Sequence, residues 1–236
     1  MSNEYFQFKQ FTIHQQRCAM KVGTDGTLLG AWAQVPKNSA RILDIGTGTG
    51  LIALMMAQRF PESTILGIDI DCEAVSQAQE NVAASPFAAR VDIQLHNVVD
   101  FECEDNFDAI VSNPPYFVDA LKCPDQHRTI ARHSISLTYE GLIKSAYRLL
   151  KPDGKFSLVI PSECRSLIDT EACLAGFFLS RVCQIRTTPR KQSKRQLIEF
   201  SKHPVDELNI EEGIIEESPN VRSSWYQTLT QDFYIR

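Results

Sequence analysis

A glycine-rich turn between a strand and a helix constrains the fold of this 236-residue chain most. The segment 41–50, Arg-Ile-Leu-Asp-Ile-Gly-Thr-Gly-Thr-Gly, is an apolar strand followed by alternate glycines, and residues 51–60 are apolar at helical spacing. Glycine lets a backbone turn sharply and approach a ligand closely. The next predicted strand ends in Asp69, 19 residues after Gly50, where an acid can hold ribose hydroxyls. Alone, the turn fits an NAD site, an FAD site or a structural bend.

A second motif, Asn113-Pro114-Pro115-Tyr116, follows the apolar strand predicted over 107–112. Open α/β sheets bind their ligands at this end of their strands. The Asn113 side-chain oxygen and a carbonyl of the Pro-Pro step can accept both hydrogen bonds of one planar NH2 group. Proline fixes the backbone, and Tyr116 can stack on a flat ring. The motif predicts a clamp for an amino group on a planar molecule; the alternative is a proline-rich turn that only closes the strand.

Composition places the chain among soluble globular proteins. Its hydrophobic fraction is 43%, its charged fraction 22% and its net charge −5. No apolar run approaches the ~20 residues of a membrane helix, and the N-terminus lacks a signal-peptide pattern. Seven scattered cysteines without a Cys-x-x-Cys pair indicate reduced thiols in the cytoplasm and no metal site.

Strand and helix patterns alternate from residue 41 to about 200, and 182–187 with 196–200 suit a final hairpin. We therefore expect an α/β fold: a seven-stranded, mostly parallel, doubly wound sheet with one antiparallel edge strand and helices on both faces. The chain should form one domain. Residues 1–40 are predicted as a strand, turn and helix extension on the cofactor side, 41–200 as the catalytic core, and 201–236 as an acidic segment and tail. Residues 117–136 are predicted as a loop over the site.

Two stretches of opposite charge follow the predicted core. The basic stretch contains Arg186, Arg190, Lys191, Lys194 and Arg195 without an acid. The acidic stretch contains Asp206, Glu207, Glu211, Glu212, Glu216 and Glu217 without a base. The basic stretch is either a solvated hairpin loop or a surface that contacts RNA phosphates, to which Arg128 and Arg132 could add. The acidic stretch is expected to be the solvated face of a helix.

The glycine turn, the acid after the second strand and the Asn-Pro-Pro-Tyr motif together resemble the class I S-adenosylmethionine-dependent methyltransferases. The resemblance implies that Asp69 holds the cofactor ribose, and that a polar residue after the third strand meets the adenine. Asn97 and Asp100 are the candidates, although Asp100 could equally cap a helix. Asp71 is predicted to cap the helix from residue 72. The amino-acid part of the cofactor would be held by Asp44, Gly46, Gly48 and Gly50.

The segment Lys21-Val22-Gly23-Thr24-Asp25-Gly26 narrows this resemblance. It is similar to the bacterial tRNA adenine-N6 methyltransferases that modify the adenosine beside the anticodon of valine tRNA, and the likeness covers nearly the whole chain. It implies a cytoplasmic, monomeric enzyme that binds S-adenosylmethionine and tRNA. Further residues expected at the cofactor are Lys21, Thr24, Asp25, Thr27 and Asn113.

Three alternatives share part of these motifs. Glutamine-N5 methyltransferases of release factors use the same clamp on a planar amide, but usually carry an N-terminal helical domain, and about 40 residues precede the glycine motif here. Guanine-N2 methyltransferases of ribosomal RNA are often longer. The third alternative is an RNA- or nucleotide-binding module without catalysis.

Overall fold

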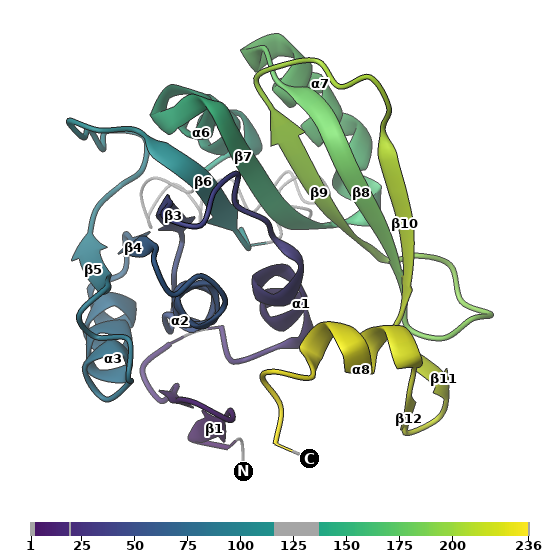
Figure 1. Cartoon of the computed structure of the whole chain (residues 1–236), viewed down its shortest axis with the longest axis horizontal. Coiled ribbons are helices and arrows are strands. Elements are labelled where there is room, and N and C mark those ends of the chain that lie inside the picture. Colours follow the sequence, from purple (N-terminus) through teal and green to yellow (C-terminus); the bar gives the residue numbers. More distant parts are fainter. Residues whose placement is uncertain (1–2, 19, 116–136, 236) are drawn as a thin grey trace, which may run out of the picture.

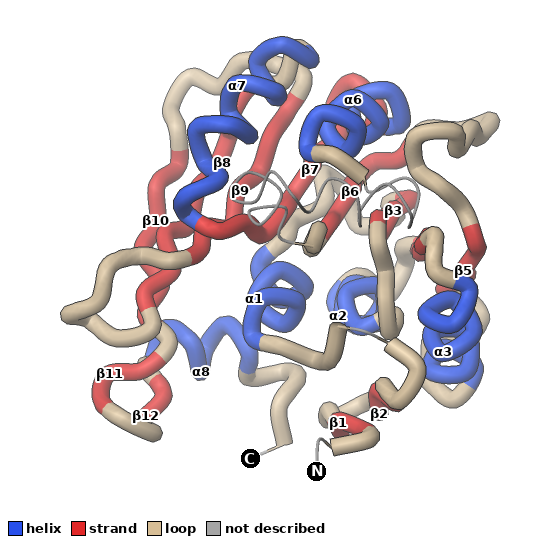
Figure 2. Tube along the Cα trace, turned by 180° about the vertical axis from the view of Figure 1, so that it is seen from behind, coloured by secondary structure: helices blue, strands red, loops and turns tan. Residues whose placement is uncertain are grey.

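The structure, a computed structural model, describes residues 3–18, 20–115 and 137–235. An eight-stranded sheet forms its centre, with helices α1, α2 and α3 against one face and α6 and α7 against the other (Figures 1 and 2). Across the sheet the strands are β10 (Asn209–Ile214), β8 (Phe178–Arg186), β9 (Arg195–Ser201), β7 (Leu150–Pro161), β6 (Phe107–Ser112), β3 (Arg41–Ile45), β4 (Thr64–Asp69) and β5 (Val91–Leu95). The helices are α1 (Thr24–Trp32), α2 (Leu51–Arg59), α3 (Cys72–Ala83), α6 (Tyr139–Leu149) and α7 (Arg165–Ala175), which follows the short 3-10 helix η2 (Ser162–Cys164).

The predicted fold class is confirmed, but two details of the sheet differ. The sheet has eight strands rather than seven, and its antiparallel strand, β9, lies inside the sheet between β7 and β8. The predicted hairpin of the last two core strands is β8 and β9. The additional strand, β10, pairs in parallel with β8 and takes the edge position.

The expected acidic helix face is wrong, because Glu211 and Glu212 lie in β10. Arginines of the neighbouring strand neutralise both carboxylates. Arg181 Nε lies 2.5 Å from Glu211 Oε1, and Arg186 Nη2 lies 2.8 Å from Glu212 Oε1. Opposite charges on adjacent strands stabilise the pairing of β10, whose two adjacent acids alone would disfavour it, with β8.

Two hydrophobic clusters explain the layers. All six residues of β6 are buried, as expected for a central parallel strand covered on both faces. On one face, Ile42 and Val111 join a cluster with α1, α2 and α3; on the other, Leu43 and Ile110 join one with α6 and α7. Consecutive residues of one strand therefore pack into hydrophobic cores on opposite faces of the sheet.

The predicted N-terminal extension of strand, turn and helix begins with two short antiparallel strands, β1 (Tyr5–Gln7) and β2 (Thr12–His14), before α1. Helix α1 begins at Thr24, directly after the turn at Gly23. At the other end of the chain, β11 (Glu216–Ser218), β12 (Val221–Arg222) and α8 (Ser224–Thr230) lead to a bridge between Phe8 and Tyr234. Both termini thus lie on the α1 side of the sheet (Figure 1).

Candidate active site

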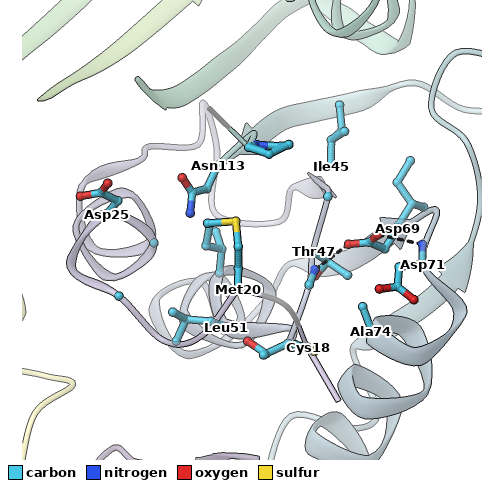
Figure 3. A pocket seen from close by; sticks show the side chains of 18 of the residues that line it. Cys18, Met20, Asp25, Ile45, Thr47, Leu51, Asp69, Asp71, Ala74 and Asn113 are labelled. Carbon is cyan, nitrogen blue, oxygen red and sulfur yellow. Dashed lines mark hydrogen bonds between the residues drawn. The ribbon is translucent and has the colours of Figure 1, made fainter. Parts of the chain in front are cut away.

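A cavity of about 530 Å³ opens at the carboxyl ends of β3, β4 and β6. This is the predicted edge of the sheet, and the volume is in the range of small-ligand sites. The glycine turn, the ends of β4 and β5, and the beginning of α1 contribute its walls (Figure 3). The predicted site residues among its lining are Lys21, Thr24, Asp25, Gly46, Gly48, Asp69, Asn97, Asn113, Pro115 and Arg195.

The three glycines of the turn have left-handed backbones, with φ of 72° at Gly46, 55° at Gly48 and 80° at Gly50. A Cβ at Gly46 or Gly48 would meet no described atom within 4 Å, so both positions leave the cavity open to a ligand. A Cβ at Gly50 would instead lie 3.4 Å from the Cβ of Ala78 in α3. Gly50 therefore lies outside the cavity lining and serves the close approach of α2 and α3.

Asp44 lies beneath the turn, fully buried and outside the cavity lining. Its Oδ2 accepts hydrogen bonds from Thr47 Oγ1 at 2.7 Å and from the Ala53 N–H at 3.1 Å. Burial raises the pKa of this carboxyl to about 7, against the opposing effect of these two hydrogen bonds. Asp44 thus joins the turn to the first helical turn of α2.

Asp69 lies at the end of β4 with its carboxylate held by backbone donors. The Gly48 N–H donates to Oδ2 at 2.9 Å, and the Asp71 N–H donates to Oδ1 at 3.0 Å. Asp71 caps α3 as predicted, through its Oδ1 and the Glu73 N–H at 3.0 Å. Figure 3 shows Asp69 and Asp71 at the end of the cavity opposite Asp25. A fixed, half-buried carboxylate at this place can accept hydrogen bonds from two ribose hydroxyls.

The segment after β5 brings Asn97, but not Asp100, to the cavity wall. Asn97 Oδ1 accepts a hydrogen bond from the Val99 N–H at 3.1 Å, and its Nδ2 donates to Asp100 Oδ2 at 3.2 Å. Asp100 therefore holds Asn97. The alternative that Asp100 caps a helix is wrong, because residues 98–100 form a turn and the described chain continues to β6 without a helix.

Asn113 comes directly after β6, and its side chain enters the cavity between α1 and β3 (Figure 3). Its Oδ1 is shut off from solvent and has no hydrogen-bond partner among the described residues. An unsatisfied buried acceptor is costly, so a ligand N–H at this point would supply the missing bond. Pro115 lines the cavity and Pro114 is buried beneath it. Tyr116 lies outside the described residues.

The N-terminal segment contributes residues that the motifs did not indicate, namely Cys18 and Met20. This segment is tied down by hydrogen bonds of Arg17 to Ser76 and Glu80 of α3. No local pattern near Cys18 indicates that it folds over a distant turn, so only the tertiary structure reveals these residues. Thr27 does not line the cavity: it is buried, and its hydroxyl donates to the Gly23 carbonyl at 3.1 Å.

The basic stretch divides into two parts. Arg190, Lys191 and Lys194 are exposed in the β8–β9 turn, where they can meet a polyanion. Arg186 pairs with Glu212, and Arg195, the first residue of β9, lines the cavity and pairs with Asp25. Arg128 and Arg132 lie outside the described residues.

No group of three or more His, Cys, Asp and Glu side chains in the part of the chain that the structure describes could hold a metal ion. None of the described helices has the length and apolar character needed to cross a membrane.

Known proteins resemble the chain over its whole length. Residues 23–178 match the family model of the methyltransferase small domain. A Phocaeicola vulgatus protein named tRNA1(Val) (adenine(37)-N6)-methyltransferase is 51% identical over 235 residues, which cover 100% of this chain and 99% of the relative. A Bacteroides thetaiotaomicron protein of the same name is 47% identical over 236 residues, which cover 100% of this chain and 99% of that relative.

Solved structures share the fold at low identity. A predicted O-methyltransferase from Agrobacterium tumefaciens superposes with a TM-score of 0.69 at 19% identity, covering 89% of this chain and 96% of that one. The glycopeptide N-methyltransferase MtfA in complex with S-adenosylmethionine superposes with a TM-score of 0.56 at 14% identity, covering 78% and 89%. The fold is therefore that of the methyltransferases, and by its full-length identity to the curated relatives the chain belongs to the tRNA1(Val) (adenine(37)-N6)-methyltransferase family.

Proposed function

We propose that this chain transfers the methyl group of S-adenosylmethionine to N6 of adenosine 37, beside the anticodon of a valine tRNA, and that it acts as a monomer. The observation that carries the proposal is the buried Asn113 Oδ1 in the cavity at the end of β6, which has no hydrogen-bond partner among the described residues. Full-length relatives that bear this name support the choice of substrate.

The residues of the cavity fit S-adenosylmethionine. Gly46 and Gly48 leave room for its amino-acid part, because a Cβ at either position would occupy the open space of the cavity. Asp69 would hold the ribose hydroxyls, and Asn97, fixed by Asp100, would lie beside the adenine. When bound, this cofactor supplies a methyl group that is already activated as a sulfonium substituent.

The clamp residues supply orientation. The adenine N6 lone pair is delocalised into the ring, which makes the amino group a weak nucleophile. If Asn113 Oδ1 and the Pro114 carbonyl each accept one N6 hydrogen, the nitrogen is held toward tetrahedral geometry and its lone pair becomes available. Tyr116 would stack on the base. Positioning of this kind can contribute about 7–11 kcal/mol to lowering the barrier.

The β8–β9 turn supports an RNA substrate. Its exposed bases, Arg190, Lys191 and Lys194, lie at the same edge of the sheet as the cavity, because β8 runs parallel to β7. Contacts from these residues to phosphates would help offset the few kcal/mol that turning a base out of a stacked loop costs by order of magnitude.

The experiment is methyl transfer from labelled S-adenosylmethionine into total tRNA that lacks this modification, with the nucleosides resolved by mass spectrometry. N6-methyladenosine at position 37 of a valine tRNA supports the proposal. Transfer to a release factor or to ribosomal RNA instead would keep the clamp chemistry and overturn the substrate. No transfer to any of them would overturn the catalytic assignment.

Asn113→Ala tests the clamp. The variant lacks the accepting oxygen, so we expect turnover to fall at least about 100-fold while cofactor affinity stays near normal. Asn106→Ala is the matched control, because Asn106 precedes β6 at the opposite edge and its side chain bonds only the Arg148 carbonyl among the described residues, at 3.2 Å. Near-normal turnover in Asn113→Ala would refute the clamp.

A further inference from the structure

An ion pair in the cavity wall joins the beginning of β9 to helix α1. Arg195 Nε pairs with Asp25 Oδ1, and both of these atoms are shut off from solvent. The side chain of Asp25 is 14% exposed and that of Arg195 is 35% exposed, so the carboxylate side of the contact is shielded while part of the guanidinium still meets solvent. Removing Arg195 would leave the shielded Asp25 carboxylate without this partner, so the contact favours one placement of the two side chains.

The backbone of Arg195 is rigid. As the first residue of β9 it is paired in register with Pro161 of β7 on one side and Ile185 of β8 on the other. The basic turn is anchored just before it: the Ser162 N–H donates to the Lys194 carbonyl at 3.0 Å. The sheet therefore fixes the backbone position of Arg195, and its side chain can hold α1 through the ion pair with Asp25.

The other partner belongs to the helical turn that packs against the clamp. Asp25 is followed by Gly26, where a Cβ would lie 3.8 Å from Asn113 Nδ2 and 3.2 Å from Leu51 Cδ2. The Asn113 amide thus lies against the backbone of α1 one residue from the ion pair. Figure 3 shows Asp25 and Asn113 toward the same end of the cavity, away from Asp69.

We infer that the Arg195–Asp25 ion pair is a positioning device that fixes the first turn of α1 and, through Gly26, the orientation of the Asn113 amide. This assigns Arg195 and Asp25 as positioning residues rather than as direct contacts of RNA and cofactor. The planar guanidinium suits the role because it fixes direction as well as charge. The inference rests on the proposed function for its effect on methyl transfer, whereas its structural part is independent of the substrate.

The variants are Asp25→Asn, Arg195→Gln and the double variant, with Arg195→Lys as the conservative change. Asp169→Asn is the matched control: it removes the carboxylate that pairs with Arg165 at 2.7 Å on α7, and Arg165 also bonds Gln196, the neighbour of Arg195. We measure kcat and KM for tRNA, the affinity for S-adenosylmethionine, and the NMR signals of the Asn113 side-chain amide, assigned by their absence in Asn113→Ser.

Each single variant should lower kcat at least about 10-fold, with KM for tRNA and cofactor affinity changed by less than about 3-fold, because a misplaced clamp costs turnover rather than binding. The double variant should be no worse than the poorer single variant, since both changes break the same contact. Arg195→Lys should recover part of the loss. The Asn113 amide signals should move in Asp25→Asn and Arg195→Gln but not in Asp169→Asn.

Unmoved Asn113 signals would overturn the inference. So would a loss in Arg195→Gln confined to KM for tRNA, which would make Arg195 a phosphate contact, or a loss in Asp25→Asn confined to cofactor affinity. If the unsubstituted protein methylates no tRNA, the proposed function fails, and the NMR signals alone then decide the inference.

Discussion

Replacing Asp44 by asparagine should change how the stability of the cofactor-free protein depends on pH. The Asp44 carboxyl is fully buried, and burial raises its pKa from an ordinary 3.8 to about 7. Between these two pH values the folded protein holds a proton on Asp44 that the unfolded chain has released. The contribution of Asp44 to the free energy of unfolding is therefore fully present at low pH. It is lost as pH rises toward the pKa of the folded state.

The size of the effect follows from the two pKa values. At about 1.4 kcal/mol for each pH unit, the whole shift corresponds to roughly 4 kcal/mol. Because unfolding is best measured between about pH 5 and pH 8, roughly 2–3 kcal/mol of this loss falls in the practical range. Asparagine carries no titrating proton, and its Oδ1 can still accept hydrogen bonds from Thr47 and Ala53. The variant should therefore lose this pH dependence of stability while the glycine-rich turn keeps its conformation.

The assay is urea unfolding of the wild-type chain and Asp44→Asn at several pH values without cofactor. Contributions of other titrating groups cancel in the difference between the two unfolding free energies. That difference should favour the variant increasingly as pH rises to about 7 and then level off. Two parallel curves across this range would show that the Asp44 pKa is not raised, and would refute the argument from burial.

Three further perturbations test the site and its scaffold. Asp69→Ala should weaken cofactor binding about 10- to 100-fold by calorimetry, because hydrogen bonds to a charged acceptor are lost; unchanged affinity would remove Asp69 from the ribose site. Gly30→Ala should destabilise the protein by about 1–3 kcal/mol in thermal unfolding, since the new Cβ would lie 2.8 Å from Met55 Sδ between α1 and α2; an unaltered melting temperature would mean that α2 gives way easily. Reversing Lys191 and Lys194 to Glu should weaken tRNA binding and flatten its dependence on salt; an unaffected salt slope would make the turn a solvated loop.

Local sequence patterns were enough for most of the scaffold. The strands 41–45 and 107–112 and the cap at Asp71 follow from apolar runs and from capping chemistry that act over a few residues. The carboxyl ends of parallel strands meet at one edge, so the sequence also indicated that Asp69 and Asn113 would share a cavity.

Pairings between distant charges could not be predicted in the same way. The acidic composition around Glu211 predicts a solvated surface, but its partner, Arg181, lies on the neighbouring strand 30 residues earlier in the chain. Arg195 lies in a basic stretch, yet its partner is Asp25 at the beginning of α1. The local composition of one segment carries no information about its distant partner, which is why the acidic stretch resembles a solvated helix face in sequence but forms a paired strand.

The direction of β9 has a consequence for how this enzyme family can change. A parallel strand would have required a crossover helix after β8, whereas the reversed strand lets a short turn cap the sheet beside the cavity. Such a turn tolerates insertions and exchanges of charge at little cost to the folded scaffold. The charge and length of this turn can therefore change without altering the strands that carry the cavity.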